Sequence, residues 1–495
     1  MEAILSIDQG TTSTRAIVFT QDGQIITTSR APLHQIYPEN GWVEQNPTEI
    51  LESVLSVMKE AYQYVTDKGI RITSLGITNQ RETTVIWDKT TGSPIYNAIV
   101  WQDRRTAELI QSLKQDNLEE TIKSKTGLML DPYFSASKIS WILDNVPNAR
   151  NLAKQNKLIF GTIDTYLIWH LTGGSVHATD VTNASRTSLF NLHTLMWDQD
   201  LLEIYNIPQN ILPVVQKCTD HFGDITTPIL GESIPIYGVA GDQQAALVGQ
   251  SCFQEGQMKS TFGTGCFALV NTGDKILRSE NNLITTIGYQ LKDTIAYGLE
   301  GSIFMAGATS DWLLDNLGVI KTHSEIETIC AVTPNDHGVY MVPAFTGLGA
   351  PWWQPNARAA IYGLTRQTTK NEIVRAAIES VAYQTNDLIT AMEKDGVDLT
   401  VMRVDGGMVG NHWFLQFLAD ITRLQIQQPS IMDCTALGVA MLSGLGHDTI
   451  SSVDAISGNW SSSFDTDIKM HINDRDRLTH KWTQGVKATI AYHSA

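Results

Sequence analysis

The sequence predicts an α/β fold, because stretches with strand patterns alternate with stretches of helical periodicity along the chain. Apolar residues recur at helical spacing in 371–394, where Asn371 is the expected N-cap, and similar patterns predict helices at 48–67, 135–146, 410–423 and 433–446. Two strand–turn–strand units with glycine and threonine in the turn lie about half a chain apart. They indicate two halves of related architecture, and we place the domains at 1–249 and 250–495, with the boundary near Gly249–Glu255.

The first of these units is "ILSIDQGTTSTRAIVFTQDGQII", which runs from Ile4 to Ile26. An apolar strand ends at Asp8, a polar turn follows, and a second strand leads to an Asp-Gly turn and a third strand. A P-loop passes from a strand into a helix, whereas this loop passes into another strand. Backbone N–H groups and hydroxyls at such a hairpin tip suit an anion. The alternative for Asp8 is a turn-capping role.

The second unit is "MKSTFGTGCFALVNTG" at 258–273, and a further strand–loop–strand unit is predicted at 72–92. Other predicted strand ends carry Asp242 in "GDQQ" and Asp405 in "DGG". Ligands bind at the carboxyl ends of strands in open α/β sheets. Two anion-holding hairpins with acids between them suit a nucleotide polyphosphate with Mg²⁺. The alternative for Asp242 is an N-cap of the helix that follows it.

Composition limits the classes of partner. The net charge of −17 and the pI of about 5.1 argue against nucleic acid and against stable association with an anionic membrane. The five cysteines are scattered without a CxxC pair, which favours free thiols in a reducing compartment. We find neither a signal-peptide pattern nor an apolar run of the roughly 18 residues a spanning helix needs. We therefore expect a cytoplasmic protein.

Eight short motifs occur in one order across Glu2–His493: "IDQGTTSTR", "NQRET", "WQDRRT", "DPYFSASK", "AGDQQAAL", "FGTGCF", "PAFTGLGAPWW" and "VDGGMVGN". Together they resemble the FGGY family of sugar and polyol kinases, and within it the members that phosphorylate glycerol. The resemblance implies an actin-like (ribonuclease H-like) ATPase fold, with two domains around a central interdomain cleft. It also implies ATP bound mostly to the C-terminal domain, glycerol between the domains, and a homodimer or homotetramer.

For the nucleotide side, the resemblance implies that Asp242 is the general base and that Asp8 and Asp242 hold Mg²⁺. Phosphoryl transfer to an alcohol needs in-line placement, charge neutralisation and a proton acceptor. The implied ATP contacts come from both hairpins and from two later segments: Thr11, Thr12, Ser13, Arg15, Thr264, Gly307, Asp311, Gly407, Met408 and Asn411.

For the glycerol side, the resemblance implies Arg81, Glu82, Tyr133, Asp242 and Gln243 as hydroxyl ligands. A small triol is discriminated by paired hydrogen bonds, because an unmatched polar group is costly. Trp101 and Phe267 would enclose the carbon chain. The alternatives are a surface ion pair for Arg81 and Glu82, and ordinary core packing for the two aromatic residues.

The chain departs from the family pattern in two places. Asp311 stands where relatives usually carry a glutamine near the ribose and adenine. The stretch "TTPILGESIP" at 226–235 lacks the glycines and arginine of a fructose 1,6-bisphosphate loop, so we do not expect that control. His221 lies outside the matching sequence of relatives activated by histidine phosphorylation, and a solvated loop histidine is the expected role.

Two rival functions remain open on these residues. One is another FGGY kinase, acting on xylulose, gluconate or a tetritol, which would need a roomier wall than Trp101 and Phe267 provide. The other is a non-catalytic actin-like nucleotide switch, such as a chaperone ATPase. A switch would share the two hairpins but would not need Arg81 and Glu82, so polyol dependence of ATP turnover distinguishes the two.

Overall fold

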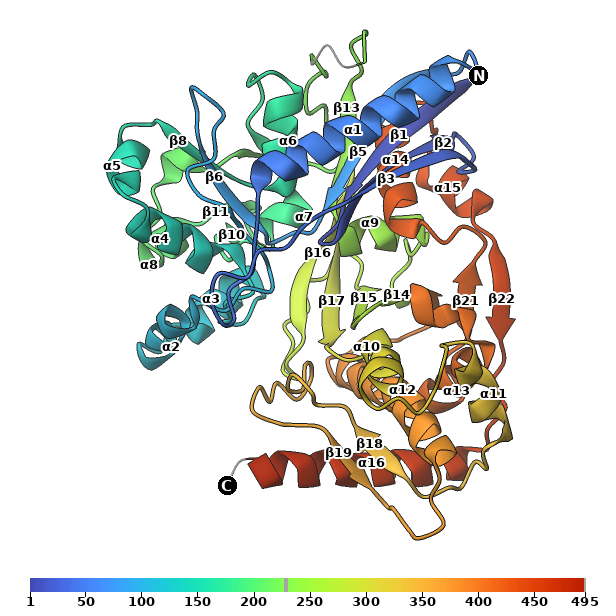
Figure 1. Ribbon diagram of the computed structural model, residues 1–495. Coiled ribbons are helices and arrows are strands. Elements are labelled where there is room, and N and C mark those ends of the chain that lie inside the picture. Colours follow the sequence, from blue (N-terminus) through green and yellow to red (C-terminus); the bar gives the residue numbers. More distant parts are fainter. Residues whose placement is uncertain (227–229, 494–495) are drawn as a thin grey trace.

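The computed structural model describes residues 1–226 and 230–493 and contains two large mixed sheets. The first has the strand order β13-β5-β1-β2-β3, and the second the order β16-β17-β15-β14-β20-β21-β22. Figure 1 shows the first sheet in the upper half of the molecule and the second in the lower half. The predicted α/β class is confirmed.

Elements in the first half of the chain are β1 (Glu2–Gln9), β2 (Ser13–Thr20), β3 (Ile25–Pro32), β4 (Glu44–Gln45), α1 (Pro47–Thr66), β5 (Arg71–Asn79), β6 (Thr84–Asp88), β7 (Ala98–Ile99), α2 (Ala107–Gln115), α3 (Glu119–Thr126), α4 (Ser135–Asn145), α5 (Ala149–Lys154), β8 (Leu158–Thr162), α6 (Ile163–Leu171), β9 (Ala178–Asp180), α7 (Val181–Ala184), β10 (Phe190–Asn191), β11 (Met196–Trp197), α8 (Gln199–Ile204), β12 (Val214–Gln216), β13 (Ile236–Gly241) and α9 (Asp242–Gly249).

Elements in the second half are β14 (Gln257–Phe262), β15 (Cys266–Asn271), β16 (Ile284–Gln290), β17 (Ile295–Ile303), α10 (Gly307–Asp311), α11 (Glu325–Val332), β18 (Tyr340–Val342), β19 (Ala360–Tyr362), α12 (Lys370–Lys394), β20 (Val401–Asp405), α13 (His412–Thr422), β21 (Ile426–Pro429), α14 (Cys434–Gly446), α15 (Val453–Asn459), β22 (Ser462–Thr466) and α16 (Ile472–His493).

Strand register brings the predicted strand ends to one edge of each sheet. β1 pairs antiparallel with β2 and parallel with β5, and β5 pairs parallel with β13, so Gln9, Asn79 and Gly241 stand in register. In the second sheet, β14 pairs antiparallel with β15 and parallel with β20, which aligns Thr261 with Asp405. Both predicted hairpins are confirmed, and the loops after β1, β5 and β13 emerge together.

The predicted helices are confirmed as α1, α4, α12, α13 and α14, with ends that shift by one or two residues. The prediction of Asn371 as an N-cap is wrong. Thr369 caps α12, because its hydroxyl accepts from the Asn371 N–H while the Glu372 carboxylate returns to the Thr369 N–H as a capping box. Asp242 is not an N-cap either: Gly241 occupies that position and Asp242 is the first helical residue.

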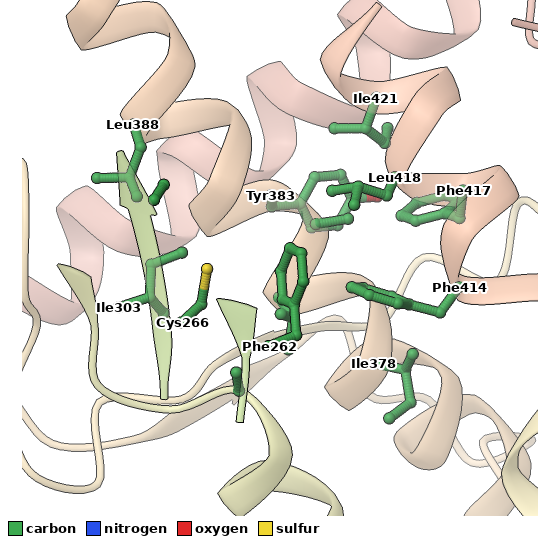
Figure 2. Close-up of a cluster of buried hydrophobic side chains, with 14 of the residues drawn as sticks. Phe262, Cys266, Ile303, Ile378, Tyr383, Leu388, Phe414, Phe417, Leu418 and Ile421 are labelled. Atoms are coloured by element: carbon green, nitrogen blue, oxygen red, sulfur yellow. The ribbon is translucent and has the colours of Figure 1, made fainter. Parts of the chain in front are cut away.

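The second sheet is covered by α12 and α13, which pack on β14, β15 and β17 through the cluster in Figure 2. Phe262 meets Phe414 edge to face at 5.3 Å between ring centroids, and Tyr383 meets Phe417 at 5.6 Å. Burying a large apolar side chain stabilises the folded state by about 1.5–3 kcal/mol, so this layer holds α12 and α13 against the sheet.

The two halves are joined by α9 and α14, which lie together between the sheets in Figure 1. Although α14 comes late in the chain, it packs against β13, β5 and β1 of the first sheet. One buried cluster therefore contains Ile4 and Val439 together with Leu269 of the second sheet. The predicted boundary at 249/250 falls between α9 and β14, and the division of the chain at that point stays a prediction.

All five cysteines are free, as the sequence predicts, and the structure places all five in buried positions. No helix among the described residues is both long and apolar enough to cross a membrane.

Candidate functional site

The first hairpin places a carboxylate and a guanidinium side by side at the end of β1. Arg15 Nε donates to Asp8 Oδ2 at 3.1 Å, and its Nη1 donates to Asp433 Oδ1 at 2.5 Å. Asp433 immediately precedes α14, so Arg15 ties the hairpin to that helix. Burial acts to lower the pKa of Arg15, but Asp8 and Asp433 outweigh it and the pKa is raised, so Arg15 stays charged.

The hairpin tip lies against the predicted glycerol wall. The Trp101 indole donates to Thr11 Oγ1 at 3.0 Å, and Gln45 Nε2 donates to the Thr11 carbonyl at 2.6 Å. Thr12 is exposed, and Ser13 is half-buried. These contacts fix the tip while leaving hydroxyls open to a ligand.

Arg81 is the hub of the site. Its Nε lies 3.1 Å from Asp242 Oδ1, its Nη2 donates to the Tyr133 hydroxyl at 2.8 Å, and its Nη1 donates to Glu300 Oε2 at 2.5 Å. The backbone of Arg81 has a φ of 51°, a left-handed conformation that non-glycine residues rarely adopt. Arg81 and Glu82 are 3% and 1% exposed, so the interpretation of this pair as a surface ion pair is wrong.

Two residues that sequence reasoning missed, Arg186 and Glu300, complete this charge cluster. Arg186 Nε donates to Glu82 Oε1 at 2.7 Å and its Nη2 donates to Glu300 Oε1 at 2.9 Å. Burial acts to raise the pKa of Glu300, but Arg186 and Arg81 lower it to about 2. The carboxylate is therefore charged at neutral pH.

Asp242 opens α9 directly beside Arg81. Its Oδ1 accepts from the Gln243 N–H at 2.7 Å, and its side chain is 31% exposed. Burial raises the pKa of Asp242 although Arg81 opposes it. A raised pKa makes the carboxylate a better proton acceptor than an ordinary aspartate.

A buried lysine that sequence reasoning also missed supports Gln243. Lys259 Nζ donates to Gln243 Oε1, to Thr261 Oγ1 at 3.0 Å and to the Phe267 carbonyl at 3.2 Å. Burial lowers the pKa of Lys259, while Asp405, Asp242 and Glu300 act to raise it. Lys259 therefore links Gln243 of the first half to the second hairpin.

Aromatic rings enclose the space beside Arg81. Trp101 meets Tyr133 at 5.6 Å and Phe267 at 6.1 Å between ring centroids, both edge to face, and the Arg81 guanidinium lies 5.9 Å from the Phe267 ring centre. All three rings are half-buried and neither Trp101 nor Phe267 belongs to a core cluster, so the core-packing interpretation is wrong. Lys138 holds the Tyr133 loop by donating to the carbonyls of Pro132, Tyr133 and Phe134.

The second hairpin meets the start of α10. The Thr264 carbonyl accepts from the N–H groups of Ala306 and Ala308 at 3.0 Å each, and the Gly307 N–H donates to Gly263 at 2.9 Å. A Cβ at Gly307 would lie 2.6 Å from the Gly263 carbonyl oxygen and 3.8 Å from Met408. The structure thus brings together Thr264, Gly307 and Met408, as the family pattern implies.

Other predicted nucleotide residues lie near this segment. A Cβ at Gly407 would meet nothing within 4 Å, so the space beside it is open. Asn411 caps α13, with its Oδ1 accepting from the Phe414 N–H at 3.0 Å. Asp311, at the end of α10, is exposed and lies 3.3 Å from His323 Nε2.

The loop expected to lack a fructose 1,6-bisphosphate site includes residues 227–229, which lie outside the described residues. Within the described part of this loop, the Glu232 carboxylate accepts a hydrogen bond from the Tyr62 hydroxyl at 2.7 Å. The imidazole of His221 is 45% exposed and lies 3.3 Å from Asp224.

Residues 3–249 match the model of the FGGY family of carbohydrate kinases, N-terminal domain, and residues 258–446 match the model of its C-terminal domain. The chain is 52% identical to a glycerol kinase of Alteromonas mediterranea, over 98% of each chain. It is 50% identical to glycerol kinase 1 of Clostridium tetani, over 99% of each chain.

Among solved structures, Plasmodium falciparum glycerol kinase with ADP superposes with a TM-score of 0.95 at 40% identity, covering 99% of this chain and 98% of that chain. A xylulose kinase from Lactobacillus acidophilus superposes with a TM-score of 0.90 at 22% identity, covering 100% and 99%, which supports the two-domain, actin-like fold alone.

Proposed function

The chain belongs to the FGGY family of carbohydrate kinases, and from that premise we propose that it transfers the γ-phosphoryl group of ATP to glycerol, giving sn-glycerol 3-phosphate and ADP. The supporting observation is the convergence of Arg81 with Tyr133 and Asp242 beside two aromatic rings. This arrangement offers donors and acceptors for hydroxyl groups within a small enclosure.

In the proposed reaction, a terminal glycerol hydroxyl attacks the γ-phosphorus and Asp242 accepts the hydroxyl proton as the new O–P bond forms. The transition state is loose, so the proton leaves late and a carboxylate suffices as the base. Arg81 stabilises the ionised form of Asp242 and directs the glycerol hydroxyls. Closure around glycerol would exclude water as a competing nucleophile.

The phosphates would be held by the two hairpins. Thr11, Thr12 and Ser13 supply donors from the first, and Thr264 from the second. Arg15 is already paired with Asp8 and Asp433, so it would offset phosphate charge through its electric field and without a direct contact.

The donor set suits Mg²⁺. Arg15 occupies Oδ2 of Asp8, and the contacts of Asp242 with Arg81 and Gln243 fall on its Oδ1. Each carboxylate thus has a second oxygen available, and Mg²⁺ in kinases is held through one or two carboxylates together with substrate phosphates. Asp8 and Asp242 would hold the ion, which would neutralise charge on the transferring phosphoryl group.

The direct test is ADP release from Mg·ATP by purified protein, with and without glycerol, in a coupled assay. Strong glycerol dependence is the expected result. Equal release with and without glycerol would instead indicate a nucleotide switch, and xylulose-dependent release would indicate another kinase of the family.

Two further properties are proposed on the family resemblance alone. These are a homodimer or homotetramer, which sedimentation velocity would measure, and a cytoplasmic location.

A further inference from the structure

Arg186 and Glu300 lie beneath the proposed glycerol-binding pair and touch both of its members. Their side chains are 0% and 1% exposed. Glu300 shares its two carboxylate oxygens between two guanidinium groups, Oε2 with Arg81 and Oε1 with Arg186. Arg186 in turn reaches Glu82 Oε1 at 2.7 Å. Two arginines and two glutamates thus form one continuous network of ion pairs, which Arg81 extends to Asp242.

The four members come from both halves of the chain. Arg81 and Glu82 follow β5 of the first sheet, and Arg186 follows the short helix α7. Glu300 lies within β17 of the second sheet, where it stands opposite Leu269 of β15 and Ile284 of β16. Because Glu300 alone belongs to the second sheet, each of its ion pairs joins the two halves at the floor of the site.

These contacts determine the orientation of the groups that would meet glycerol. An arginine side chain has several rotatable bonds, and Glu300 anchors the Nη1 end of Arg81 while Nε faces Asp242. For Glu82, Arg186 engages Oε1, and no hydrogen bond among the described residues reaches Oε2. The second oxygen of Glu82 is therefore the one left for a ligand.

We infer that Arg186 and Glu300 are positioning residues for the polyol: they hold Arg81 and Glu82 in the orientation that glycerol hydroxyls require, and they couple that orientation to the relative position of the two halves. This inference rests on the proposed function. It assigns Glu300, on the second sheet, a part in glycerol affinity rather than in nucleotide binding.

The test is Glu300→Gln, which keeps the shape of the side chain and removes its charge. We expect the KM for glycerol to rise by about 10- to 100-fold, because Arg81 loses the charged hydrogen bond that orients it. The KM for ATP should stay near that of the wild type. Direct glycerol titration, followed by tryptophan fluorescence without ATP, should show the same loss of affinity.

A matched control exists in α12, where Glu379 pairs with Arg375 at 2.7 Å and both side chains are 2–3% exposed. Glu379→Gln removes an equally buried charge from a pair that lies outside the site. It should lower the melting temperature and leave the KM for glycerol unchanged. A comparable rise of this KM in Glu379→Gln would show a general effect of lost stability and would overturn the inference.

Arg186→Lys is the second variant and serves if Glu300→Gln does not fold. Lysine keeps the charge but lacks the planar fork that joins Glu82 and Glu300, so the KM for glycerol should again rise. An unchanged KM in either folded variant would refute the positioning role. If the wild-type protein itself releases ADP without glycerol dependence, the proposed function fails, and that result is distinct from a failure of the network.

Discussion

Gly438 stands where α14 crosses α9, and we predict that Gly438→Ala separates the two helices. A Cβ at Gly438 would lie 1.8 Å from the Ala245 carbonyl oxygen and 3.0 Å from the Gly249 nitrogen. Both contacts are backbone atoms, so no side-chain rotation relieves them. The oxygen would have to recede by about 1.6 Å to reach the 3.4 Å of an ordinary contact.

Two opposing terms determine the effect on stability. Overpacking lowers the free energy of unfolding by about 1–3 kcal/mol. Replacing a helix-interior glycine with alanine raises it by about 1 kcal/mol through helix propensity. Because the clash is with backbone, we expect a net loss of about 2 kcal/mol, seen as a lower melting temperature. Turnover should fall further, since α9 begins at Asp242 and α14 follows Asp433. A displacement of about 1 Å at such groups costs about 100-fold in rate.

The assays are thermal melting and glycerol-dependent ADP release on the purified variant. Gly458→Ala in α15 is the control, because a Cβ there would meet nothing within 4 Å. It should melt at or above the wild-type temperature with normal turnover. Wild-type stability and turnover in Gly438→Ala would refute the argument that close helix contact sets the site geometry.

Three further predictions follow from the charges of the site. Asp242→Asn should bind glycerol as the wild type does, as measured by fluorescence titration, but lose about 100- to 10,000-fold in turnover, the usual contribution of a general base; near-normal rates would exclude Asp242 from that role. Turnover of the wild type should fall as acid protonates Asp242, and the fall should begin at a higher pH than for an ordinary aspartate because burial raises the pKa of Asp242. A pH–rate profile measures this fall. A turnover that does not decline on the acid side of the profile would contradict the prediction. The pKa of Glu300 is lowered from 4.5 to about 2, so its contribution to folding stability is present above pH 4.5 and is lost as the pH falls towards 2. The free energy of unfolding in urea, measured at several pH values, should therefore fall less with acid in Glu300→Gln than in the wild type. An equal fall in both proteins would count against the ion network.

Local patterns predicted the hairpins and the helices well, because turn chemistry and apolar periodicity act over a few neighbouring residues. The Asp22-Gly23 turn, for example, connects β2 and β3 as the sequence indicates. The N-cap of α12 was predicted wrongly although the signal was present. Thr369 and Glu372 have the spacing of a capping box, which is more specific than an asparagine next to a helix.

The supporting shell of the site was not predictable in the same way. Arg186 and Glu300 are 114 residues apart, and they meet because α7 packs near β16, the neighbour of β17 in the second sheet. The one available signal was a glutamate within the strand segment "YGLEGSIF", where a charge is costly unless it is paired. Lys259, within "QMKSTF", carried the same signal. A single charged residue inside a strand indicates a buried pair but does not identify its partner.

The fold alone does not select the acceptor, because a xylulose kinase at 22% identity superposes over the whole chain. The choice must therefore depend on side chains that face the acceptor. Trp101 and Phe267 stand nearly perpendicular at 6.1 Å, and the same Trp101 indole is bonded to Thr11 of the phosphate hairpin. Moving the wall outward to admit a longer sugar would thus also disturb the hairpin that we propose for the phosphates. Acceptor length and phosphate placement are coupled through one side chain, which favours a short polyol as the substrate.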